Sequence, residues 1–152
     1  MIHGRHPVRY DAIQACLDLV AADPKLGKLI ERIGDHAQRI ASTYAALNSG
    51  KPLDPRIVKE IEEARVSAVH LLDTAFTALL TRDIDAANQA IDGRVAHQTM
   101  VEALAHRVSS RRGEELLALG NVVDSLGRAA AYTSEIAEQG IDIAVMTDPE
   151  AT

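Results

Sequence analysis

Apolar residues recur at alternating steps of three and four along most of the chain, which is the spacing of one face of an α-helix. The pattern predicts five helices, at about residues 8–22, 24–48, 55–81, 84–108 and 113–139. The stripes are regular on the second, third and fifth of these helices, whereas the apolar positions of the fourth drift around it. Long amphipathic helices joined by short loops pack as antiparallel bundles, so an all-α bundle is expected.

Local signals place the helix ends. Two Asp-Pro steps, at residues 23–24 and 54–55, put a capping carboxylate before a proline at the first helical position, where its missing amide costs nothing. Residues 48–52 and 109–113 carry the small and breaking residues of loops. Beyond the fifth helix, residues 142–152 are expected to form a partly loose tail.

The composition agrees with this fold class. Aromatic residues make up only 3% of the 152 residues, and the 47% of hydrophobic residues are mostly Ala, Leu, Ile and Val, which disfavours all-β folds. The net charge of −6 argues against nucleic-acid or anionic-membrane binding. No apolar run is long enough to cross a membrane, and the single Cys16 excludes an internal disulfide and a paired-cysteine zinc site. A cytoplasmic protein is expected.

One segment of the chain repeats. A shift of 93 residues, from Leu26 to Leu119, lays the second helix on the fifth and also matches glycine with glycine twice, Gly27 with Gly120 and Gly34 with Gly127. A glycine inside a helix costs about 1 kcal/mol relative to alanine. We therefore expect these glycines to allow close helix contact or the approach of a ligand to the backbone.

Two carboxylates in the first copy are spaced for joint action. Glu31 and Asp35 are four residues apart, so they share one side of the helix, facing away from the apolar stripe. A cation would relieve their repulsion, and hard oxygen ligands favour Mg²⁺, Mn²⁺, Ca²⁺ or iron. The alternative interpretation is a solvated acidic face balanced by Lys28, Arg32 and Arg39.

The segment around these acids, Leu-Ile-Glu-Arg-Ile-Gly-Asp-His-Ala-Gln-Arg-Ile-Ala at residues 29–41, resembles the signature of the PhoU family of phosphate-uptake regulators. The resemblance implies a PhoU-like antiparallel bundle, in which a three-helix domain similar to a spectrin repeat is preceded by additional N-terminal helices. It places one PhoU-type three-helix domain at residues 55–140, a partial repeat with the N-terminal helices at 1–50, and a tail at 141–152.

The same resemblance implies a function. It suggests a cytoplasmic, non-enzymatic regulator of phosphate uptake and homeostasis, acting through contacts with the phosphate ABC transporter ATPase or its sensor kinase. It also implies binding of a divalent metal or iron, with Glu31 and Asp35 as ligands in the first copy and Asp124 in the second. In the second copy Arg128 replaces the second acid, which predicts a weakened site and an ion pair between Arg128 and Asp124.

Other interpretations stay open. A helical scaffold or oligomerisation protein that has lost regulation would explain Arg128 and the replacement of His36 by Ala129. A metalloenzyme built on Glu31 and Asp35 is disfavoured because no nucleophile or general base accompanies them. Two helices that would cover the 24–48 helix are missing from the first copy, so its apolar stripe predicts a homodimer.

Overall fold

The protein is a bundle of α-helices. A computed structural model describes residues 7–147, together with their side chains except those of residues 7–13 and 16. No strand occurs in this range, and the helices are α1 (Pro7–Ala22), α2 (Pro24–Asn48), α3 (Pro55–Thr81), α4 (Ile84–Val108) and α5 (Gly113–Thr147). The first four begin and end within one residue of the predicted ranges, and the all-α antiparallel bundle is confirmed.

Helix starts follow the predicted capping chemistry. The Asp23 carboxylate accepts a hydrogen bond from the amide of Lys25, and the Asp54 carboxylate accepts one from the amide of Arg56, each at 2.9 Å. Each acid thereby satisfies an amide that the first turn leaves without a partner. At the other end of α3, Arg82 adopts the left-handed conformation with φ of 57°, which ends the helix before α4 begins.

The fifth helix is longer than its predicted range of 113–139. It continues to Thr147, so the loose tail expected from residue 142 is wrong as far as Thr147, and residues 148–152 lie outside the described part of the chain. Gly140 is not a helix stop, because it is buried where a Cβ atom would lie 3.4 Å from the Cα atom of Leu79. Packing against α3 stabilises the helix past Gly140, and Ala144, one turn further on, is buried as well.

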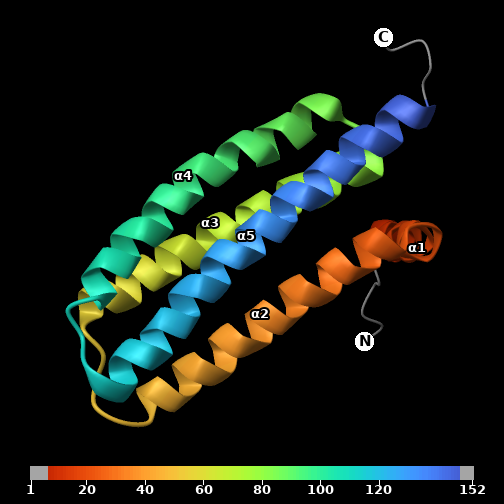
Figure 1. The fold of residues 1–152 in the computed structure, drawn as a ribbon. Helices are drawn as coiled ribbons and strands as arrows, with labels where there is room; N and C mark the ends of the chain where they lie inside the picture. The colour runs from red at the N-terminus through yellow and green to blue at the C-terminus, as the bar shows by residue number, and fades with distance from the viewer. Residues whose placement is uncertain (1–6, 148–152) are drawn as a thin grey trace.

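The helices divide into a body and a limb (Figure 1). The body consists of α3, α4 and α5, each of which packs against the other two. The limb consists of α1 and α2, and α2 runs along the outer side of α5 in the opposite direction. Within the described residues, the Cα atoms of α2 come within 8 Å of α5 and α1 but not of α3 or α4.

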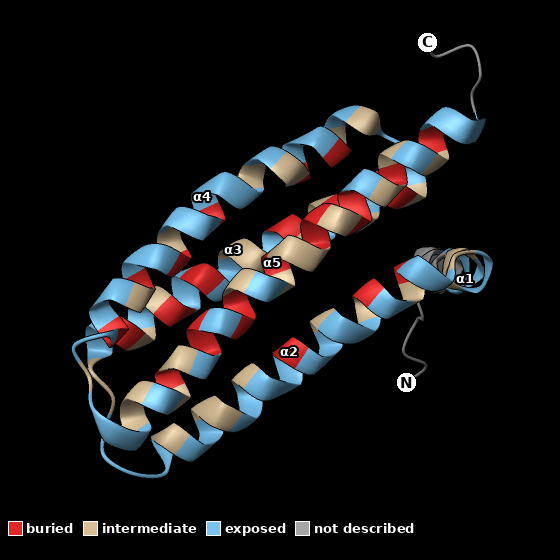
Figure 2. Cartoon of the chain, viewed as in Figure 1, coloured by how far each residue is buried: buried red, intermediate tan, exposed pale blue. Residues whose placement is uncertain are grey.

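Burial follows the same division (Figure 2). The predicted stripe of α5 is fully buried, at Leu119, Val123, Leu126, Ala130, Thr133 and Ala137. In α2 only Leu26, Leu29 and His36 are buried, and the rest of its apolar stripe is half-buried or exposed. None of the helices in the described range is long and apolar enough to cross a lipid bilayer.

Candidate functional site

The two copies of the repeated segment pack against each other. Leu26 and Leu29 at the start of α2 share a cluster with Ile136 and Ala137, late in α5. At the other end of α2, Leu47 packs against the cluster of residues that includes Leu119 and Val122, early in α5. The two helices are thus antiparallel, and they meet at mid-length, where Ala37 of α2 and Ala129 of α5 lie in one groove that is described below.

His36 lies at this meeting point and contacts α5. Its side chain is 8% exposed, and its ring centroid is 5.8 Å from that of Tyr132. The guanidinium carbon of Arg32 lies 5.4 Å from the centroid of the same tyrosine ring, within the range of a cation–π contact. The Nδ1 atom of His36 is buried and accepts or donates no hydrogen bond. His36 is therefore a packing residue between the two copies.

Burial lowers the pKa of His36, and the charge of Arg39 lowers it further. Asp124 and Asp35 act in the opposite direction, while Arg128 adds to the lowering. The charged groups of both copies of the motif therefore surround one imidazole. Their net effect, with burial as the largest cause, favours the neutral ring.

The predicted metal-ligating acids are all exposed. Glu31 and Asp35 lie on the solvent side of α2, as their spacing predicts, and Asp124 lies on α5. The carboxylate oxygens of Asp124 accept hydrogen bonds from Nε of Arg128 at 3.2 and 3.3 Å, so the expected ion pair is present. Among the described side chains of residues 7–147, no group of three or more His, Cys, Asp or Glu lies close enough together to hold a metal ion. Metal binding at these acids stays a prediction.

The repeated glycines lie in different surroundings. A Cβ atom at Gly34 or Gly120 would meet nothing within 4 Å, so the expectation of close contact is wrong for these two. At Gly127 it would lie 3.6 Å from Val101 of α4, and at Gly27 it would lie 3.1 Å from Val20 of α1. Gly34 and Gly127 differ because α4 covers that side of α5, whereas no described helix covers the matching side of α2.

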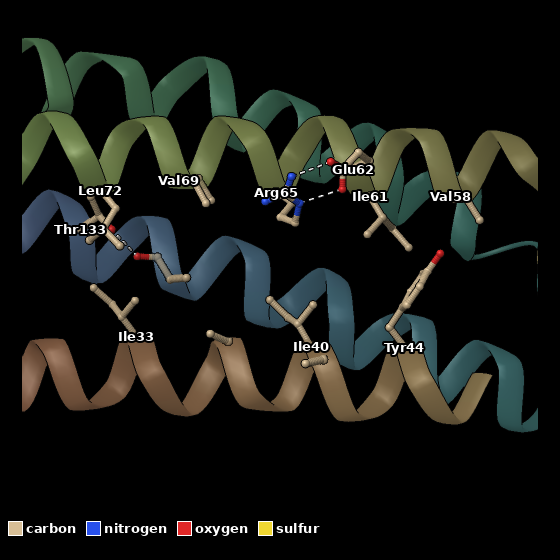
Figure 3. A pocket seen from close by; sticks show the side chains of 14 residues that line it. Ile33, Ile40, Tyr44, Val58, Ile61, Glu62, Arg65, Val69, Leu72 and Thr133 are labelled. Carbon is tan, nitrogen blue, oxygen red and sulfur yellow. Dashed lines mark hydrogen bonds and ion pairs between the residues drawn. The ribbon is translucent and has the colours of Figure 1, made fainter. Parts of the chain in front are cut away.

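An apolar groove of about 680 Å³ runs between α2 and α3, with α5 as its floor (Figure 3). Ile33 of α2 lies at the end of the groove that holds Leu72 of α3, and Tyr44 lies at the other end, opposite Val58. Its full lining is Ile33, Ala37, Ile40, Ala41, Tyr44, Val58, Ile61, Glu62, Arg65, Ala68, Val69, Leu72, Ala129 and Thr133.

The two charged residues of this groove neutralise each other. Two guanidinium nitrogens of Arg65 donate to Glu62, Nε at 2.7 Å and Nη2 at 2.6 Å from the carboxylate oxygens. The hydrogen bonds with Glu62 raise the pKa of Arg65, and the same bonds lower the pKa of the Glu62 carboxyl. The groove therefore presents an apolar surface without a free charge, which suits an apolar helix better than a charged small molecule.

The role of His97 could not be inferred from its position in the sequence. It is 1% exposed between the three helices of the body, with Nδ1 3.0 Å from Oγ of Ser67 and Nε2 3.2 Å from the carbonyl oxygen of Leu126. Burial lowers its pKa, against a smaller opposite effect of the Leu126 carbonyl. A neutral ring that donates from Nε2 and accepts at Nδ1 satisfies both contacts. Val95 of the same helix, by contrast, is 71% exposed.

Comparisons of the chain with protein-family models, curated proteins and solved structures find no match.

Proposed function

We propose that the protein is a cytoplasmic, non-enzymatic regulator of phosphate uptake that acts through contacts with a phosphate ABC transporter ATPase or a phosphate sensor kinase. The observation that carries the proposal is the segment at residues 29–41, which resembles the PhoU signature and lies on the helix that packs against its own repeat in α5. The arrangement supports it because both copies present their acidic residues to solvent.

The mechanism is differential binding. A regulator without its own chemistry shifts a partner between two states only if it binds one of them more tightly. The exposed acidic side of α2, with Glu31 and Asp35, offers a polar contact surface, and the neighbouring groove offers an apolar one. We place the partner contact on the acidic side, because the motif residues lie there.

A binding experiment tests the proposal. The purified chain is immobilised and presented with the ATPase subunit and, separately, with the sensor kinase. We expect one of them to be retained, and the double variant Glu31→Gln/Asp35→Asn to lose at least tenfold in affinity. Glu138→Gln/Asp142→Asn is the matched control, because these exposed acids have the same four-residue spacing on α5. Retention of neither protein, or equal losses in both double variants, would contradict the proposal.

Metal binding by the motif is tested on the same variants. We expect the chain to bind Mn²⁺ or Fe²⁺ through the two carboxylates of α2, because hard cations prefer oxygen ligands. Metal analysis after equilibrium dialysis should show a loss of bound metal in Glu31→Gln/Asp35→Asn and no loss in the control pair on α5. Equal metal content in both would dismiss this part of the proposal and leave the protein contacts to be judged separately.

A second candidate function is a helical scaffold that has lost regulation. The specific observation in its favour is the Asp124–Arg128 pair, in which the remaining acid of the second copy is already bound by its own cation. If this candidate is correct, Glu31→Gln/Asp35→Asn has no effect on binding to the ATPase or the kinase. Variants in the apolar groove would then be the ones that change assembly.

A further inference from the structure

The groove between α2 and α3 is an uncovered apolar surface that joins the limb to the body. Its α3 wall, from Val58 to Leu72, is about 21 Å long at the helical rise of 1.5 Å per residue. Val69, which faces it, is 54% exposed, and Tyr44 and Ile33 are only half-buried. Apolar patches of this kind on one molecule mark places where another element docks.

The internal repeat indicates that the α2 wall of the groove is built to be covered. The shift of 93 residues relates three pairs of positions, Ile33 with Leu126, Ala37 with Ala130 and Tyr44 with Ala137. On α5 these positions are 1%, 2% and 0% exposed, because the body packs over them. On α2 the same positions are half-buried, exposed and half-buried. The apolar pattern is shared, and only the covering helices differ.

The chain cannot cover this groove with its own first helix. One residue, Asp23, separates α1 from α2, and its extended backbone, with φ of −129° and ψ of 98°, directs α1 away from the length of α2. The proline that follows disfavours helical backbone at Asp23. Among the α1 side chains that the structure describes, Leu19 and Val20 pack beside α2 and α3.

The projecting helix α1 has the properties of an occupant. It contains 16 residues, which corresponds to about 24 Å and matches the length of the groove. Its sequence carries no charged residue between Asp11 and Asp18, in agreement with a groove whose own charges are paired. Leu17, within this uncharged stretch, is 57% exposed, so one chain leaves an apolar side chain of α1 uncovered.

The size of the contact favours a reciprocal exchange. Residues 7–18 of α1 form about 18 Å of helix, and seating half of its surface would bury about 560 Å² on both sides together, for a diameter of about 10 Å. A single contact of this size lies below the roughly 1,000 Å² of a stable interface, whereas two equivalent contacts bury about 1,100 Å².

We infer that the protein forms a two-fold symmetric homodimer in which α1 of each copy lies in the groove between α2 and α3 of the other. In this dimer, α1 of the other copy covers the apolar side of α2, as α3 and α4 cover the matching side of α5 within one chain. It is independent of the proposed function, because it uses neither the acidic residues nor a phosphate-system partner. Its occupant is a second copy of this chain.

Light scattering of the full chain tests this. The wild type should have twice the 16.4 kDa mass of one chain. Leu17→Glu on α1 and Val69→Glu in the groove should each weaken the dimer at least tenfold, because each puts a charge into an apolar contact. Both side chains are exposed within one chain, so each variant should keep its helical circular dichroism. Val95→Glu, at an exposed valine of α4 outside the groove, is the matched control and should remain dimeric.

Cross-linking identifies the occupant. Leu17→Cys and Val69→Cys are made in separate, differently tagged chains that also carry Cys16→Ser, and the two are mixed and oxidised. We expect a disulfide between the two chains, and none when Val95→Cys replaces Val69→Cys. A monomeric wild type at the highest attainable concentration would overturn the inference. So would a dimer that survives both glutamate variants, or a groove that binds only a separate amphipathic peptide.

Discussion

The body and the limb are built from related sequences, yet they reach different degrees of burial. In the body, α5 is covered by α3 and α4 on one side and by α2 on the other. In the limb, α2 is supported by α5 along its length and by α1 at one end. The same apolar stripe is therefore a core in one helix and a groove wall in the other. An amphipathic pattern gives a helix an apolar surface that can be buried, and the neighbouring helices determine whether it is buried.

The largest expected effect compares two equivalent positions of the repeat. Leu126→Ala removes a side chain that is 1% exposed, and we expect it to lower the free energy of unfolding by roughly 3 kcal/mol. Ile33→Ala, at the matching position of α2, is half-buried and should cost roughly 1 kcal/mol. Urea unfolding at protein concentrations low enough to keep the chains monomeric measures both. Equal losses would mean that limb and body are equally packed.

The second effect concerns pH and the two buried imidazoles. Burial lowers the pKa of both His97 in the body and His36 in the limb, so the folded protein disfavours their charged forms. An unfolded histidine titrates near pH 6.5. Below that value the unfolded chain binds protons that the folded chain does not, and the free energy of unfolding falls. Above pH 6.5 both states hold neutral histidines, so the folded protein keeps its full free energy of unfolding.

Variants assign this pH dependence to the two regions. We expect His97→Leu to flatten the loss of stability between pH 7 and pH 5, and His36→Leu to remove a smaller part, because burial is deeper at His97. Leu104→Ala serves as the control, since it lowers stability at every pH without removing a titrating group. Unchanged slopes in both histidine variants would show that neither ring stays neutral in the folded protein.

How far the fold is encoded locally can be judged from particular residues. The capping acids Asp23 and Asp54 and the prolines after them fixed two helix starts, because this chemistry involves only adjacent residues. The end of α5 was placed too early, at residue 139, because the helix continues where Gly140 packs against Leu79 of α3, a contact that the local sequence does not reveal. Predictions from adjacent residues hold here, and those that need a neighbouring helix do not.

The candidate site shows the same limit. The spacing of Glu31 and Asp35 was enough to place both on the solvent side of α2. The buried ring of His97 was not found, because its partner Ser67 lies 30 residues away on another helix. The missing cover of α2 was foreseen from the truncated first copy, but the groove itself depends on where α3 lies.

A smaller effect is expected at the glycines. Gly34→Ala places a Cβ atom in open space inside a helix and should raise the free energy of unfolding by about 0.5–1 kcal/mol. Gly93→Ala in the body should gain less, because its Cβ atom would lie 2.6 Å from Cδ2 of the buried Leu71, which must move. Thermal unfolding of the two variants compares them directly. A larger gain for Gly93→Ala would contradict the tighter packing of the body.

The smallest effect compares two ion pairs of different placement. Arg111, between α4 and α5, donates to Asp54 at the start of α3 at 2.7 Å, and their side chains are 28% and 29% exposed. Arg128 and Asp124 join two turns of one helix and are 60% and 54% exposed. We expect Arg111→Gln to lower the urea midpoint, because it removes the ion pair between two distant segments and leaves Asp54 without its cation. Arg128→Gln should leave the midpoint unchanged. If Arg128→Gln is the more damaging, the surface where the two copies of the motif meet contributes to stability beyond what its exposure indicates.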